Sequence, residues 1–274
     1  MKNKQNLHTH TTFADGKDTP EELILEAIRR GFQGIGFSEH TYTPYSTYPN
    51  QMTEEKMPAY REQIAGLKEK YKGQIDIFCG LEYEFTSQVP AQGYDYLIGS
   101  VHYLQVADGM RTFDRGLEEA GLYIRNYFDG SGMAFAKAYF ETVARLPEKG
   151  DFDIIGHFDL LAKHNEKGRF FDTRDKAYLE LGYEAIAALR GKIPFFELNT
   201  GAVGRGHATT PFPNLAFIEE FRRQGFGVVI TSDCHDKNQM DFYFREAEQL
   251  LLAAGYRSHW ILTESGFEEA PLCK

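Results

Sequence analysis

Histidine and carboxylate side chains form similar short patterns near the two ends of the sequence. His8 and His10 stand in LHTHTTFADG, and Asp233 and His235 stand in TSDCH. In an extended strand, side chains two residues apart point to the same face, so each pair would present two ligand groups side by side. Imidazole and carboxylate groups suit Zn, Mn or Fe. The pairs therefore indicate a metal site, although each residue alone is also compatible with a hydrogen-bonded strand end.

Segments with a strand pattern alternate with segments that have a helical pattern. We expect strands at residues 6–10, 34–40, 75–85, 95–104, 152–161, 193–199 and 227–235, and a weaker one at 259–264. Helical patterns occupy residues 20–31, 54–71, 176–190, 215–225 and 242–254. Such alternation is typical of a parallel sheet, either closed into a barrel or open and doubly wound.

Nearly every expected strand ends in a polar group that could bind a metal. Beyond the two terminal pairs, these are His40, Glu82, His102, His157 and Asn199. The carboxyl ends of the strands converge on one rim of a β/α barrel, whereas an open sheet gathers ligands only at its switch point. We therefore predict an α/β fold, a single distorted (β/α)7 TIM-like barrel over residues 1–274, with the metal site at the C-terminal ends of the strands.

Composition narrows the class of protein. The chain has 274 residues, of which 42% are hydrophobic, and a formal net charge of -10. This charge argues against nucleic acid or an anionic membrane surface as a partner. Three cysteines without paired spacing, a polar N-terminus and the lack of a long apolar run predict a cytoplasmic protein with no membrane partner. The sequence carries no signal for an oligomeric state.

The motifs LHTHTTFADG, FSEH, GLEYEF, SVHYL, GHFDLL and TSDCH cover nearly the whole chain. Their order and spacing resemble the PHP (polymerase and histidinol phosphatase) metallophosphoesterases. The resemblance implies a distorted seven-stranded barrel that holds up to three divalent ions, Zn, Mn or Fe. It also implies three ligand groups: His8, His10, Glu82 and Asp233; Glu82, His102 and His157; and Asp15, His40 and His235.

Two of these ligands have alternatives in the sequence. Glu84 shares a strand face with Glu82, and the G-x-E pattern of the family selects Glu82. Asp15 precedes Gly16 and could be a turn residue, but an aspartate at this place is typical of the histidinol-phosphatase branch. A helical insertion at about residues 103–150 resembles that of stand-alone histidinol phosphatases, and could equally be a lid or a dimer surface.

These features lead to the hypothesis of a metal-dependent phosphomonoesterase. The expected reaction is hydrolysis of L-histidinol phosphate, a step of histidine biosynthesis, through attack by a metal-activated hydroxide. We expect catalytic roles for Asp233, His8, His10 and Glu82, and substrate contacts from Arg205, Lys163 and Glu39. The alternatives are a PHP phosphoesterase acting on another small phosphate ester or trimming nucleic acid, and an inactive metal-binding regulatory module.

Overall fold

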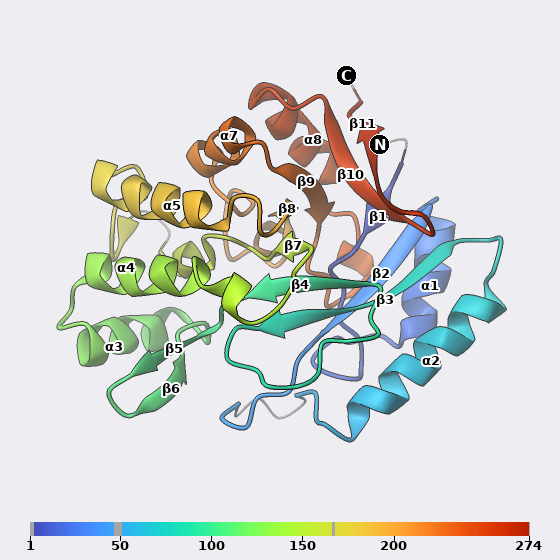
Figure 1. Ribbon diagram of the computed structural model, residues 1–274, viewed down its shortest axis with the longest axis horizontal. Coiled ribbons are helices and arrows are strands. Elements are labelled where there is room, and N and C mark those ends of the chain that lie inside the picture. The colour runs from blue at the N-terminus through green and yellow to red at the C-terminus, as the bar shows by residue number, and fades with distance from the viewer. Residues whose placement is uncertain (1–2, 47–50, 166–167, 274) are drawn as a thin grey trace.

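The computed structural model describes residues 3–46, 51–165 and 168–273, and its central feature is a sheet of seven parallel strands in the order β1-β2-β3-β4-β7-β8-β9 (Figure 1). In chain order, the strands of this sheet are β1 (Gln5–Asn6), β2 (Gly34–His40), β3 (Asp76–Glu84), β4 (Tyr96–Ser100), β7 (Ile154–Ile155), β8 (Phe195–Asn199) and β9 (Gly227–Thr231).

The two edges of the sheet meet beyond the ends of β1 and β9. Thr9 and Cys234 form a parallel bridge, in which the Cys234 N–H donates to the His8 carbonyl (3.0 Å) and the His10 N–H donates to the Cys234 carbonyl (2.8 Å). This bridge brings the two predicted ligand pairs next to each other. The predicted seven-stranded barrel is confirmed, although its closure is limited to this short contact.

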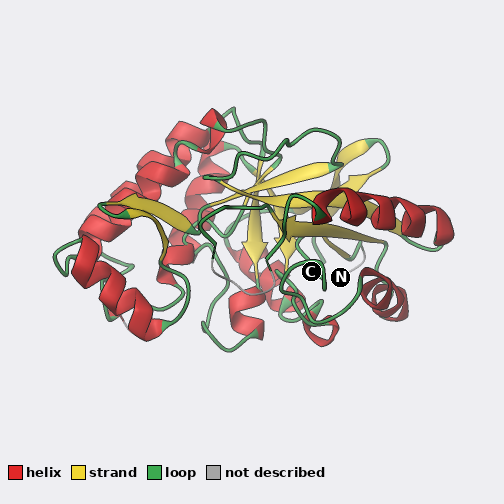
Figure 2. Cartoon of the chain, turned by 90° about the horizontal axis from the view of Figure 1, so that it is seen from below, coloured by secondary structure: helices red, strands yellow, loops and turns green. Residues whose placement is uncertain are grey.

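Helices lie around the strands (Figure 2). The first begins as its sequence predicts: Thr19 and Glu22 form a capping box, Pro20 occupies the first turn, and Leu23 and Ile24 are buried against the sheet. The helices are α1 (Pro20–Arg29), α2 (Lys56–Lys70), α3 (Leu117–Tyr127), α4 (Gly132–Val143), α5 (Lys176–Leu189), α6 (Gly201–Gly204), α7 (Leu215–Gln224) and α8 (Phe244–Ala253). None of the helices in the described part of the chain is long and apolar enough to cross a membrane.

Several strands end earlier than predicted, because their last residues turn toward the site. The expected strand 227–235 stops at Thr231, and Asp233 has a left-handed backbone conformation (φ 45°) that an extended strand excludes. The expected strand 152–161 is reduced to β7, followed by the short 3-10 helix η2 (Leu160–Ala162). Here the His157 N–H donates to the Glu197 carboxylate (2.6 Å) and not to a neighbouring strand.

The predicted insertion begins with a hairpin and not with a helix. The expected strand 95–104 divides into β4 of the barrel and β5 (Tyr103–Val106), which pairs with β6 (Gly109–Thr112) outside it. Helices α3 and α4 and the 3-10 helix η1 (Leu146–Glu148) follow before the chain returns to the barrel (Figure 1). The segment therefore carries its own small sheet beside the barrel.

A second hairpin, β10 (Ser258–Thr263) with β11 (Gly266–Pro271), covers the amino-terminal ends of the strands. The Gln5 side chain at the start of β1 exchanges two hydrogen bonds with the backbone of Leu262. Trp260 packs on Phe195 at the start of β8. A Cβ atom on Gly227, at the start of β9, would lie 2.5 Å from the Trp260 indole nitrogen, so this position needs glycine. The weaker expected strand 259–264 is thus real but lies outside the barrel sheet.

Candidate metal centre

Glu82, at the carboxyl end of β3, lies at the centre of the histidine cluster. The buried carboxylate accepts from His157 Nε2 at 2.8 Å through Oε1 and lies 2.7 Å from His40 Nδ1 through Oε2. His102 Nε2 and His8 Nε2 each lie 3.4 Å from one of its oxygens. One carboxylate thus faces imidazoles from four different segments, as a bridging metal ligand would.

Asp233 faces the first histidine pair across the closure of the barrel. Its Oδ1 atom lies 3.2 Å from His10 Nε2 and 3.7 Å from His8 Nε2. The left-handed conformation of Asp233 turns the carboxylate toward these rings, and the Arg205 guanidinium donates to Oδ2 at 2.8 Å. His8, His10 and Asp233 are close enough for one ion to contact all three.

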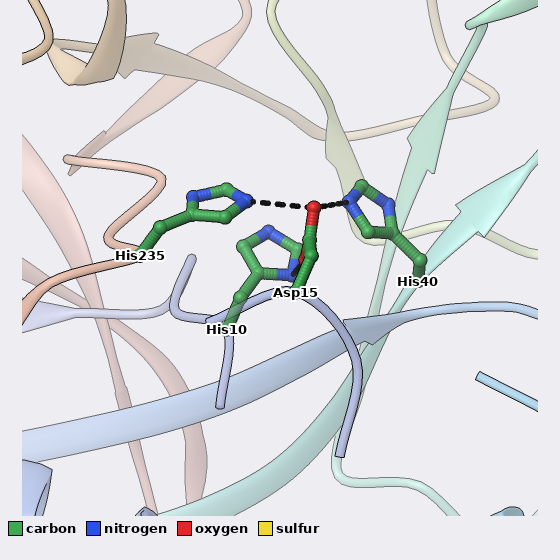
Figure 3. A group of neighbouring side chains, drawn as sticks. All are labelled: His10, Asp15, His40 and His235. Carbon is green, nitrogen blue, oxygen red and sulfur yellow. Dashed lines mark ion pairs between the residues drawn. The ribbon is translucent and has the colours of Figure 1, made fainter. Parts of the chain in front are cut away.

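Asp15 forms the third group, which opens to the surface of the site (Figure 3). Its Oδ2 atom lies 3.3 Å from His235 Nε2 and 3.6 Å from His40 Nε2. The ring of His10 lies between those of His40 and His235, with centroid distances of 4.4 and 4.3 Å. His10, Asp15, His40 and His235 could therefore also share an ion.

The electrostatics of the cluster follow from its mixture of buried acids and imidazoles. Burial disfavours the charged form of Glu82, but His40, His102 and His8 outweigh it and hold the pKa of that carboxyl well below its ordinary value. His10 behaves differently: burial, together with the neighbouring rings of His235 and His40, lowers its pKa to about 3. Glu82 is therefore ionised and His10 neutral near pH 7, the states in which each binds a metal.

Several buried ligand atoms have no hydrogen-bond partner among the described residues. These atoms are His8 Nε2 and both ring nitrogens of His10. Leaving such atoms unpaired in a protein interior costs free energy, and bound cations would satisfy them. The donor set of nitrogen and oxygen also fits Zn, Mn or Fe. The residues present thus fit a group of divalent ions.

The structure brings all the predicted metal ligands into this one cluster, but its grouping differs in detail from the expected one. His10 lies near Asp15 as well as near Asp233, and His40 lies near Glu82 as well as near Asp15. Groups compact enough for one ion are His10, Asp15, His40 and His235; His8, His10 and Asp233; and His40, Glu82 and His102. Ligand roles for the individual residues stay predictions.

Two buried carboxylates support the candidate ligands: Glu197, which the sequence did not single out, and Glu84, which the sequence offered only as an alternative to Glu82. Glu197 on β8 accepts from His8 Nδ1 (2.8 Å) and from the His157 N–H (2.6 Å). Glu84 accepts from the His102 N–H (2.8 Å) and faces His102 Nδ1 (3.1 Å). Hydrogen bonds of this kind fix which imidazole nitrogen faces a metal. The only signal in the sequence was an acid within a strand otherwise rich in apolar residues.

A cavity of about 290 Å³ opens above the cluster. Arg205 and Lys163 line it, together with Asp233, Glu82 and other predicted ligands. Glu39 does not line this cavity: it is fully buried, and its Oε1 atom accepts from the Thr11 N–H (2.8 Å) and hydroxyl (2.5 Å). The position of Glu39 beside His40 fits support of the ligand segments, and no contact in the structure favours its predicted role in substrate binding.

Known proteins resemble this chain over most of its length. A probable histidinol-phosphatase of Deinococcus radiodurans is 26% identical over 92% of this chain and 94% of its own. A histidinol-phosphatase of Lactococcus lactis is 24% identical over 97% of this chain and 96% of its own. The crystal structure of the Lactococcus lactis histidinol phosphate phosphatase, complexed with zinc, L-histidinol and phosphate, superposes with a TM-score of 0.70 at 19% identity, covering 97% and 98% of the two chains.

A second solved structure, a putative histidinol phosphatase of Listeria monocytogenes, gives a TM-score of 0.74 at 20% identity and covers 88% of this chain and 99% of its own. At such identities the solved structures establish the fold. The model of the PHP domain matches residues 6–201, which include strands β2 to β8 and most of the predicted ligands. On fold, motif order and this match, the chain belongs to the PHP domain family.

Proposed function

We propose that this protein is a metal-dependent phosphomonoesterase that hydrolyses L-histidinol phosphate to L-histidinol and inorganic phosphate. One observation carries the proposal: imidazoles and carboxylates from most of the barrel strands meet at the base of a small cavity whose wall holds cationic side chains, Arg205 and Lys163 among them. The names of relatives that this chain matches over nearly their whole length support the choice of substrate.

The residues of the cluster supply sites for divalent ions, and the number and identity of these ions are part of the proposal. We propose up to three ions per chain, of Zn, Mn or Fe, held by the predicted ligands. When bound, such ions activate water near neutral pH and offset the negative charge of a phosphoryl group. Phosphate monoesters need a barrier reduction of about 20 kcal/mol or more.

Arg205 would orient both the ligands and the substrate. Its guanidinium donates to the Asp233 carbonyl (2.6 Å) and to Asp233 Oδ2 (2.8 Å), and it lines the cavity. Burial disfavours the charge, but Asp233 holds the pKa of Arg205 above its ordinary value, so the group stays cationic. A planar guanidinium has further N–H groups for a phosphoryl oxygen of the ester.

Asp233 and His10 have different roles in the proposed reaction. Burial, together with His235 and His40, keeps His10 neutral, so it would bind and orient without adding charge. The Asp233 carboxylate contacts both Arg205 and the histidine pair, and we propose it as the acceptor of the proton that the attacking water loses. The small size of the cavity suits a small phosphate ester.

The substrate is tested by comparing kcat/KM for L-histidinol phosphate with that for p-nitrophenyl phosphate, using protein of measured metal content. We expect histidinol phosphate to be favoured by at least about tenfold, because a cavity that recognises polar groups rejects an ester that lacks them. Equal values would favour another small phosphate ester. A metal-loaded protein that hydrolyses neither ester would support an inactive binding module and contradict the proposed enzyme.

A further inference from the structure

The insertion between β4 and β7 contributes a carboxylate to the wall of the cavity. Asp114 follows β6 in the insertion and lines the cavity. Lys163, which belongs to the barrel and follows η2, lines the same cavity. Lys163 Nζ donates to Asp114 Oδ2 at 2.9 Å, and His164 Nε2 lies 3.5 Å from Asp114 Oδ1. Two consecutive residues of the barrel thus face one carboxylate of the insertion.

The position of Asp114 is fixed by the core of the insertion. The preceding Phe113 is buried and packs edge-on against Phe135 and Tyr139 of α4, with centroid distances of 5.3 and 5.5 Å. The Asp114 N–H donates to the Thr112 hydroxyl (3.2 Å). Because these contacts hold the backbone that leads into Asp114, the carboxylate is presented to the cavity from a fixed segment.

The ion pair is sheltered from solvent, so it differs from an ordinary surface pair. The side chains of Lys163 and Asp114 are 15% and 12% exposed. Burial disfavours ionisation of Asp114, but Lys163 and His164 hold the pKa of its carboxyl well below the usual range. The ion pair therefore holds the lysine in a fixed orientation, whereas a free lysine side chain samples many rotamers.

His207 lines the same cavity as Lys163 and Arg205. Burial lowers the pKa of His207, and these two cations lower it further. Arg205 contacts the predicted metal ligand Asp233, whereas Lys163 pairs with the insertion. These two of the cations that line the cavity thus have separate supports, one on the barrel and one on the insertion.

We propose that Asp114 is a positioning residue for substrate recognition: it holds Lys163 at the wall of the cavity so that the ammonium group binds the phosphate ester. The inference rests on the proposed phosphatase function and deepens it. It gives the insertion a definite task, because the barrel alone supplies Lys163 but not the carboxylate that orients it.

The test is a double-mutant cycle of Asp114→Asn, Lys163→Gln and the double variant, each loaded with metal and analysed for metal content. We expect Lys163→Gln to raise KM about tenfold with little change in kcat, since it removes a charged contact present before and during the reaction. Asp114→Asn should raise KM by about threefold to tenfold. The double variant should be no worse than Lys163→Gln, because Asp114 acts through the lysine.

Three controls separate a positioning role of Asp114 from a purely structural one. Asp172→Asn changes an acid that is 55% exposed and pairs with Arg174 outside the cavity, and it should leave KM unchanged. Asp114→Glu, which keeps the charge, should restore part of the affinity. Thermal unfolding of each variant would reveal a purely structural role, in which the unfolding temperature falls while KM stays constant. That result, or additive KM effects in the double variant, would overturn the inference.

The inference and the proposed function fail in different ways. If the wild-type protein did not hydrolyse histidinol phosphate, the proposed substrate would be wrong. The binding of inorganic phosphate to the metal-loaded variants, measured by calorimetry or as inhibition of p-nitrophenyl phosphate hydrolysis, would still decide the role of Asp114. We expect phosphate to bind about tenfold more weakly to Lys163→Gln and nearly as weakly to Asp114→Asn. Unchanged binding in both would overturn the inference.

Discussion

The two ends of the barrel hold buried histidines in opposite surroundings. At the carboxyl end, His8 faces the carboxylates of Glu197, Glu82 and Asp233. At the amino end, His259 lies in β10, 2% exposed, and its Nε2 atom has no hydrogen-bond partner among the described residues. The same residue type therefore serves as a candidate ligand at one end and as part of the packing at the other.

The pKa values of His8 and His259 are shifted in opposite directions. Burial disfavours the charged form of His8, but the three carboxylates outweigh it and raise its pKa well above the ordinary value. His259 has no such neighbours, and burial lowers its pKa to about 4. The difference shows that burial alone does not mark a functional histidine; convergent carboxylates do.

The two ends of the barrel also differ in how tightly their side chains are packed. A small apolar cluster with Leu7, Ile98 and Val229 fills the barrel toward the amino end, and Trp260 and Phe267 of the second hairpin pack against it. The carboxyl end instead leaves a cavity lined by charged groups. One end of the barrel is thus closed by apolar packing, and the other is kept open for chemistry.

The largest effect should come from removing a group at the open end. We expect His8→Ala and Asp233→Ala each to lower kcat/KM for phosphate release by about a thousandfold or more, because they remove groups that would hold the ions on which the reaction depends. His259→Ala, at the closed end, should change kcat/KM per folded molecule by less than about threefold. Metal content is measured alongside the rate. Comparable losses in all three variants would mean that the cluster is not the active site.

The second prediction concerns the pH dependence of stability that His259 causes at the closed end of the barrel. His259 is neutral in the folded protein down to about pH 4, whereas in the unfolded chain it takes up a proton near pH 6.5. Between these values the unfolded state binds more protons, so the stability contributed by the neutral ring is present above pH 6.5 and is lost as the pH falls toward 4. The loss attributable to His259 should be about 3 kcal/mol.

His259→Leu should remove this part of the pH dependence. Urea unfolding from pH 8 to pH 4, in the presence of a chelator so that metal release does not contribute, gives the free energy of unfolding of both proteins. At pH 8 the ring is neutral in both states, so the difference measured there reports packing alone. On acidification the free energy of unfolding of the wild type should fall by about 3 kcal/mol more than that of His259→Leu. Parallel curves would show that His259 does not titrate differently in the folded state.

The sequence was sufficient to predict the barrel and the convergence of the candidate ligands, for a physical reason. Strand patterns place the ends of parallel strands on one rim, so histidines and acids at those ends had to converge. The predicted strand ends were less accurate. Asp233 reaches its neighbours through a left-handed backbone conformation, and His157 leaves the sheet by bonding to Glu197, neither of which a period-two pattern contains.

Other features depend on distances that the sequence does not carry. Glu197 stands in the apolar run IPFFELN, which predicts a strand, and nothing local reveals the imidazole of His8 that it meets from the segment after β1. The pairing of Asp114 with Lys163 joins segments 49 residues apart. The sharing of His10 between two ligand groups is likewise visible only once the strands are closed into a barrel.

The smallest expected effect concerns a residue that supports the ligands without facing the cavity. Glu197 Oε2 accepts from His8 Nδ1 and from the Thr231 hydroxyl, each at 2.8 Å, so the Nε2 atom of His8 is directed toward Glu82 and Asp233. Glu197→Gln keeps the size of the side chain but weakens this restraint. We expect the apparent affinity for Zn, measured by competition with a chelator, to fall by about tenfold to a hundredfold.

The amino end offers the matched control. Asp153 is a partly buried acid just before β7, and its Oδ2 atom accepts from the Leu97 N–H at 2.8 Å, remote from the ligand cluster. Asp153→Asn should leave the Zn affinity within about twofold of the wild type, even where it lowers the midpoint of thermal unfolding. At saturating Zn, Glu197→Gln should recover most of its kcat, because its ligands remain present. An unchanged Zn affinity in Glu197→Gln would show that the geometry of the metal centre is set by the ligand segments themselves and not by the carboxylate behind them.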